Sequence, residues 1–188
     1  MDSRIRRVEF DDKNHRYFFD GKELKGITGA IGRYLGKKFP DTDRMKLAAL
    51  YGADVHKEIE KHYNNGGELF TEAGKKVEEI ISQMITEEIV ERIESEVMVS
   101  DFESTASKVD IVIHLPDNRV WLLDIKTTSK FDRAYCSFQL SVYKKLYEEC
   151  YGKKVEKLFV IGTKSGRCFT ILPQEESKVA RIIQMNKE

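Results

Sequence analysis

Two aspartates and a lysine lie on neighbouring stretches of the chain that are rich in Val and Ile. Asp110 belongs to the first stretch, and Asp124 and Lys126 stand two positions apart in the second. Because alternate side chains of a β-strand share a face, Asp124 and Lys126 are predicted to point together. A hairpin between the two stretches would place Asp110 beside them. Two carboxylates at one point can bind Mg²⁺, and a neighbouring lysine can orient water or stabilise charge on a phosphate.

Two further pairs of polar residues have helical spacing. His56 and Glu60 are four positions apart and are expected to share one helical face, and both are residue types that can bind a metal or handle a proton. Gln139 and Tyr143 have the same spacing and can hydrogen-bond a phosphate or a base. Each feature also has an ordinary explanation, because helical histidines and surface polar residues are common and an Asp-x-Lys pair is usually a salt bridge.

The elements that must position these residues follow from apolar periodicity and turn signals. The sequence predicts a β-hairpin over Val8–Asp20, a loop over Gly36–Thr42 containing Pro40, long helices over Asp43–Tyr63, Thr71–Ile93 and Arg133–Tyr151, strands over Glu96–Ser100, Lys108–Leu115, Val120–Thr127, Lys157–Thr163 and Arg167–Leu172, and a last helix from about Gln174. This order predicts an α/β fold in which helices flank a mixed central β-sheet, with a hairpin at the N-terminus.

Length and charge narrow the class of protein. The 188 residues suit a single domain over 1–188, with a hairpin and leader over 1–42 and a core over 43–188 that holds the candidate catalytic residues. Lys+Arg and Asp+Glu are both 32, so the net charge is zero. This balance weighs against a protein that coats DNA, but an enzyme can keep a locally positive cleft while distant acidic helices cancel its charge.

Apolar runs and cysteines indicate the cellular compartment in which the protein is expected. No apolar run approaches the roughly 18 residues of a membrane-spanning helix, and the charged N-terminus lacks the apolar stretch of a signal peptide. Cys136, Cys150 and Cys168 are an odd number at wide spacings, which suits a reducing compartment. The chain is therefore expected to be cytoplasmic.

The order of the motifs resembles the PD-(D/E)XK nuclease superfamily, in the RecB-like branch that includes many phage exonucleases. The resemblance covers about residues 50 to 145 and rests on Gly52-x-x-x-His56, Asp110, Asp124-Ile125-Lys126-Thr127 and Gln139-x-x-x-Tyr143. Glu96 also sits where that branch often has a glutamate. A looser match, to the leader of phage-encoded members, rests on His15-x-Tyr17, Asp20-Gly21-Lys22 and Gly26-Ile27-Thr28.

The resemblance implies a restriction-endonuclease-like core and a role for each matched residue. His56, Asp110, Asp124 and the backbone carbonyl of Ile125 would bind the metal, and Lys126 would be the catalytic lysine. Gln139 and Tyr143 would contact DNA, and Glu60 and Glu96 would support the ligands or hold a second metal. The metal would be Mg²⁺, with Mn²⁺ fitting the same ligands.

This sequence departs from the family pattern at two places. The family often has a glycine shortly before the first motif aspartate, where this chain has Ala106-Ser107-Lys108. Some relatives close the domain with a four-cysteine iron–sulfur cluster, which three cysteines at other positions cannot supply. The resemblance therefore implies no iron–sulfur cluster.

The expected function is metal-dependent hydrolysis of DNA by an exonuclease in phage or bacterial recombination or repair, with single strands or duplex ends as substrate. A homo-oligomer or a recombination partner protein would be compatible with this role. An endonuclease on the same fold stays open, and so does a non-catalytic nucleic-acid-binding module, although degenerate members usually lose an acidic residue or the lysine. A structural interaction protein built from the charged helix over 72–94 would leave the ordered motifs unexplained.

Overall fold

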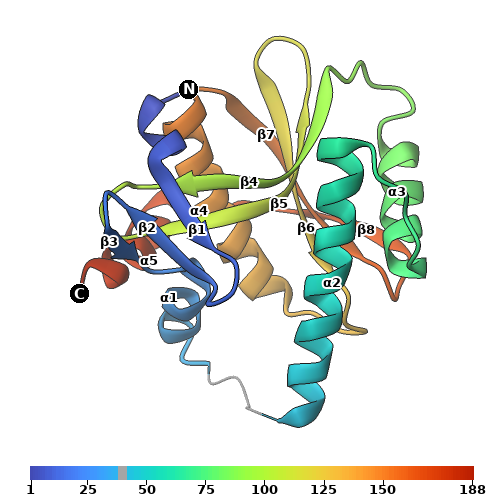
Figure 1. Ribbon diagram of the computed structural model, residues 1–188. Helices are drawn as coiled ribbons and strands as arrows, with labels where there is room; N and C mark the ends of the chain where they lie inside the picture. Colours follow the sequence, from blue (N-terminus) through green and yellow to red (C-terminus); the bar gives the residue numbers. More distant parts are fainter. Residues whose placement is uncertain (38–41) are drawn as a thin grey trace.

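A five-stranded mixed sheet forms the centre of the computed structural model, which describes residues 1–37 and 42–188 (Figure 1). The strands lie in the order β4 (Arg92–Ser100), β5 (Ala106–His114), β6 (Arg119–Lys126), β7 (Lys154–Gly162) and β8 (Arg167–Ile171). Neighbouring strands are antiparallel except for the parallel pair β6 and β7. Because parallel neighbours need a crossover connection, the chain passes through α4 (Arg133–Tyr151) between them.

Helices cover both faces of this sheet. The first face packs against α4, α1 (Ile27–Tyr34) and α5 (Glu176–Lys187), and the second packs against α2 (Asp43–Asn65) and α3 (Glu72–Met84). Strand β6 contributes side chains to the cores on both faces, because alternate residues point to opposite sides. Leu122 belongs to the first core and Leu123 to the second. The predicted fold class, a mixed sheet flanked by helices, is confirmed. None of the helices in the described ranges is long and apolar enough to cross a membrane.

The N-terminal hairpin is also confirmed and is part of a three-stranded antiparallel sheet. After the 3-10 helix η1 (Ser3–Arg7) come β1 (Val8–Asp11), β2 (Arg16–Phe19) and β3 (Lys22–Leu24). Tyr17 and Leu24 of this sheet pack with Ala106 at the start of β5. The hairpin is thereby attached beside one end of the central sheet. The loop predicted around Pro40 lies outside the described residues.

The prediction that the second long helix continues to Ile93 is wrong. Helix α3 ends at Met84, and Ile93 lies in β4, where it pairs with Ile113 of β5. The apolar spacing of Ile89 and Ile93 continues the helical period, but Ile89 is 76% exposed and packs against neither core. The residues after the helix pair with β5 instead, and this long-range pairing cannot be read from local periodicity.

Two side-chain-to-backbone hydrogen bonds fix α2 against β4. Asn64, near the end of α2, donates from Nδ2 to the Ser95 carbonyl and accepts the Ser95 N–H at Oδ1, both at 2.9 Å. The Ser95 hydroxyl in turn donates to the Asp110 carbonyl at 2.7 Å. This Asn64–Ser95 clamp lies next to Glu96 and sets the distance between α2 and the strands that carry the acidic residues.

Asn64→Ala should therefore lower the free energy of unfolding by about 1–3 kcal/mol, because it leaves the N–H and the carbonyl of buried Ser95 without these partners. Urea unfolding measures the change. Asn65→Ala, at the exposed neighbouring position, is the matched control. Equal losses in the two variants would show that the clamp does not stabilise the fold.

Asp101 organises the turn between β4 and β5. Its Oδ1 accepts the backbone N–H groups of Glu103, Ser104 and Thr105 at 3.0, 2.8 and 2.8 Å, and its Oδ2 accepts the Ser104 hydroxyl at 2.7 Å. Burial alone would raise the pKa of this carboxyl, but the hydrogen bonds outweigh burial and hold the pKa below its ordinary 3.8. The turn sets a register in which Ser95 pairs with Ile111 and Val97 with Val109, so Glu96 and Asp110 lie between the same two pairs.

A carboxyl whose pKa is lowered by folding stabilises the fold above its unfolded pKa and loses that contribution as pH falls through the folded pKa. Asp101→Ala should thus be less stable by about 1–3 kcal/mol at neutral pH, and the difference from wild type should shrink below about pH 4. Urea unfolding at several pH values tests this. A deficit that stays constant into strong acid would contradict the assigned hydrogen bonds; Asp54→Ala, at an exposed position, is the control.

Candidate metal centre

The centre is built where strands β5 and β6 separate. Their ladder runs from His114 opposite Val120 to Ile111 opposite Leu123 and stops there. Asp110 precedes Ile111 on β5, just beyond the end of the ladder, and its Oδ2 accepts the backbone N–H of Ile125 at 2.7 Å. A buried carboxylate thus takes a hydrogen bond at the position where the strand ladder ends. The predicted approach of Asp110 to the Asp124–Lys126 strand is confirmed.

Asp124 and Lys126 point together, as strand alternation predicts. Lys126 Nζ donates to Asp124 Oδ1 at 2.9 Å and lies 2.7 Å from Oδ2, but the second contact lacks hydrogen-bond geometry. Asp124 is 1% exposed, and its Oδ2 has no hydrogen-bond donor among the described residues. One buried oxygen is therefore left with lone pairs to offer an added cation.

Gln139 and Tyr143 of α4 continue this network behind Lys126. Lys126 Nζ donates to Gln139 Oε1 at 3.2 Å, Gln139 Nε2 donates to the Tyr143 hydroxyl at 3.0 Å, and Ser107 Oγ donates to the same hydroxyl at 3.5 Å. Both α4 side chains are buried. Gln139 thus orients the lysine and Tyr143 supports Gln139, while the predicted contact of both residues with DNA stays a prediction.

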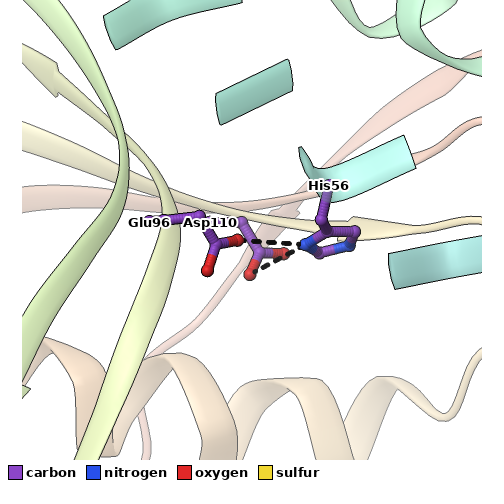
Figure 2. A group of neighbouring side chains, drawn as sticks. All are labelled: His56, Glu96 and Asp110. Atoms are coloured by element: carbon purple, nitrogen blue, oxygen red, sulfur yellow. Dashed lines mark hydrogen bonds and ion pairs between the residues drawn. The ribbon is translucent and has the colours of Figure 1, made fainter. Parts of the chain in front are cut away.

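His56, Glu96 and Asp110 converge from three elements, as Figure 2 shows. His56 Nδ1 on α2 lies 3.3 Å from Glu96 Oε1 and 3.6 Å from Asp110 Oδ1. One ligand atom from each residue lies within 4.8 Å of the others. An ion bound at about 2.1 Å separates opposite ligands by about 4.2 Å, so small side-chain shifts bring these three around one cation. The cluster could hold a metal ion.

The backbone of Glu96 is unusual within its strand. Glu96 has φ +55°, a left-handed conformation that non-glycine residues seldom adopt. The strand resumes its register on both sides, with Ser95 opposite Ile111 and Val97 opposite Val109. The break directs the Glu96 carboxylate toward His56. Such local strain is typical of functional positions.

The acidic residues and the cations shift one another's protonation. Burial raises the pKa of Asp110, and the nearby carboxylates of Asp124 and Glu96 add to the rise, although His56 opposes it. Burial would lower the pKa of His56, but Asp110 and Glu96 raise it well above its ordinary value. The pKa of Lys126 is likewise raised by Asp124 and Asp110 against the effect of burial. The site therefore concentrates negative charge that favours cations.

A cleft of about 480 Å³ opens onto this centre. Its lining includes His56, Glu60, Glu96, Lys108 and Lys126, together with small residues of α2 and the hairpin residues Phe10, Asp12 and His15. A Cβ on Gly52 would lie 3.2 Å from Thr127 Oγ1, so glycine at this position allows α2 to lie close to the end of β6. A reacting group could reach both the cluster and Lys126 through this opening.

Glu60 and Glu96, which were predicted to have the same supporting role, lie in different places. Glu96 belongs to the His56–Asp110 cluster, whereas Glu60 lines the cleft wall outside it. Sequence reasoning also passed over Lys108, whose Nζ lies 3.7 Å from Glu96 Oε2 and 4.0 Å from the centre of the Phe10 ring. Lys108 precedes Asp110 by two positions on β5, so strand alternation could have identified it.

Comparisons with known proteins give distant likenesses. No family model matches the chain, and no curated protein matches it. A structure from Eubacterium rectale, described as that of a "putative exonuclease", is 15% identical and aligns over 87% of this chain and 78% of its own, with a TM-score of 0.43. Another, of a protein designated only by a locus number, is 12% identical over 87% and 75%, with a TM-score of 0.42. Neither likeness assigns an activity at this distance.

The cluster geometry predicts a difference between the two glutamates. Glu96→Gln should weaken Mn²⁺ binding at least about tenfold, because it removes a charged oxygen ligand. Glu60→Gln makes the same substitution on the cleft wall, outside the cluster, and should leave the Mn²⁺ affinity within about twofold of wild type. Isothermal titration calorimetry with Mn²⁺ measures both. Equal effects would contradict the placement of Glu96 in the metal centre.

Proposed function

We propose that this protein is a metal-dependent DNA nuclease of the PD-(D/E)XK type, related to its RecB-like branch, that hydrolyses phosphodiester bonds. The observation that carries the proposal is the placement of Lys126 and Asp124 beside the His56–Glu96–Asp110 cluster, where Lys126, His56 and Glu96 line one cleft. A structural salt bridge would not need three further ionisable groups from separate elements around it. This combination suits phosphate chemistry, where a metal and a fixed cation act on one group.

His56, Glu96 and Asp110 would hold the metal, with Asp124 and the carbonyl of Ile125 as further ligands. The Oδ2 of Asp124 accepts no hydrogen bond from the described residues and faces only the Lys126 ammonium, which supports a place for Asp124 in the set. A bound Mg²⁺ or Mn²⁺ would polarise the phosphate and lower the pKa of a bound water. Carboxylate oxygens suit both ions, and the larger availability of Mg²⁺ makes it the expected metal.

Lys126 would supply a fixed positive charge at the reacting phosphate. Its ammonium is held by Asp124 and Gln139, and Asp124 and Asp110 raise its pKa. A lysine that stays protonated stabilises negative charge that develops during hydrolysis and can hydrogen-bond the attacking water. Gln139 and Tyr143 would keep this ammonium in place and, as we propose, help to orient the scissile strand.

The expected role is exonucleolytic processing of DNA during recombination or repair. Lys126→Ala should reduce cutting at least about a thousandfold, in keeping with the loss of a group that stabilises transition-state charge. Labelled linear single-stranded DNA, linear duplex and a closed circular plasmid serve as substrates with Mg²⁺, Mn²⁺ or EDTA. Lys154→Ala, an exposed lysine at the start of β7, controls for loss of surface charge.

The substrates separate the remaining possibilities. Metal-dependent loss of linear DNA with the circle spared would make the enzyme an exonuclease, and cutting of the circle would make it an endonuclease. Binding without cutting under any metal would favour a non-catalytic nucleic-acid-binding module. Wild-type cutting by Lys126→Ala would refute the assigned site.

A further inference from the structure

A second hollow, of about 530 Å³, adjoins the catalytic cleft. It lies between the first half of α2, the segment that follows β6 and the turn between β7 and β8. The two hollows share four lining residues, Met45, Ala48, Thr127 and Thr128. A chain-like ligand could therefore pass from the metal centre into the second hollow without leaving the protein surface.

The first half of α2 presents an unusually apolar surface there. Figure 1 shows this part of the helix projecting beyond the central sheet. Leu47 is 68% exposed and Tyr51 40% exposed, and both line the hollow. Together with Arg44 and Ala48 they follow the i, i+3, i+4, i+7 spacing of one helical face. Aromatic side chains are usually buried in a core, whereas the Tyr51 ring is open to a ligand.

Three cations surround that apolar face. Arg44 comes from α2, Lys130 from the segment after β6, and Lys164 from the β7–β8 turn. All three are exposed, and no ion pair of theirs occurs among the described residues, whereas all four lysines of α3 and α4 are paired with glutamates. Lys164 Nζ lies 5.8 Å from the centre of the Tyr51 ring.

We propose that this second hollow, here called the α2 groove, binds the single-stranded nucleic acid that continues from the scissile phosphate. Tyr51 and Leu47 would contact the faces of bases, and Arg44, Lys130 and Lys164 would contact phosphates. The inference rests on the proposed nuclease function and adds a substrate class to it. Alternating apolar and cationic contacts are what a flexible strand of bases and phosphates requires.

A duplex and a protein fit the groove less well. Stacking on Tyr51 needs an exposed base face, and a duplex hides its base faces in the helical stack. A protein partner could cover Leu47 and Tyr51, but it would not explain three cations from separate elements that have no ion pair in the described part of the chain. It would also leave unexplained the continuity with the cleft that holds Lys126. The groove therefore favours single strands.

Binding of end-labelled single-stranded DNA, measured by fluorescence anisotropy in EDTA, tests the groove without any cutting. Tyr51→Ala should weaken binding about tenfold, whereas Tyr51→Phe keeps the ring and should bind within about twofold of wild type. Removing Lys130 or Lys164 should reduce the slope of log affinity against log salt by about 0.7 each. Lys154→Ala should leave the slope unchanged.

Several outcomes would overturn the inference. Wild-type affinity in Tyr51→Ala and in Lys130→Ala would do so, and would leave the apolar face to a protein partner. Equal weakening of duplex binding in these variants would remove the single-strand specificity. Competition by polyglutamate as strong as that by unlabelled DNA would show that charge alone is recognised.

The nuclease activity and the groove are tested by separate variants, so each can fail without the other. Lys126→Ala cutting at the wild-type rate would refute the catalytic assignment, yet weakened binding in Tyr51→Ala would still place a single strand in the groove. Conversely, a metal-dependent activity that Lys126→Ala lacks, combined with unchanged binding in the groove variants, would keep the nuclease and remove the groove.

Discussion

The buried carboxylate of Asp110 is the constraint on which the site depends. It accepts the N–H of Ile125 at the point where the β5–β6 ladder ends, so one side chain both satisfies the backbone and holds two strands apart. An unpaired N–H buried there would cost about 1–3 kcal/mol. Beyond the end of this ladder Asp124 pairs with Lys126, and His56 lies 3.6 Å from the other oxygen of Asp110.

Charge is concentrated at this separation and is balanced by neighbours from different elements. Burial and mutual repulsion raise the pKa of Asp110, and the same carboxylates raise the pKa of His56 and Lys126. Such a cluster is stable only if cations share it. The imidazole of His56 and the ammonium of Lys126, whose pKa values the carboxylates raise, supply this positive charge. A divalent ion would compete with the imidazole proton for the same oxygens.

Helix α2 links the candidate metal centre to the proposed strand-binding groove. Its middle carries His56 into the cluster, and its last turn is fixed to β4 by the clamp between Asn64 and Ser95. Its first half instead has no core to cover and exposes Leu47 and Tyr51. The stability of one end thus allows the other end to display apolar side chains beside the cleft.

Local pattern was enough to determine the strand that bears Asp124 and Lys126, the hairpin that brings Asp110 to it, and the helix that bears His56, because alternation and turn residues act over a few positions. Contacts between distant segments decided the rest. Pairing with β5 ended α3 before Ile93, and the left-handed backbone of Glu96 placed that glutamate, rather than Glu60, in the candidate metal cluster. Sequence periodicity describes which face a residue occupies, whereas only the packed chain determines what that face meets.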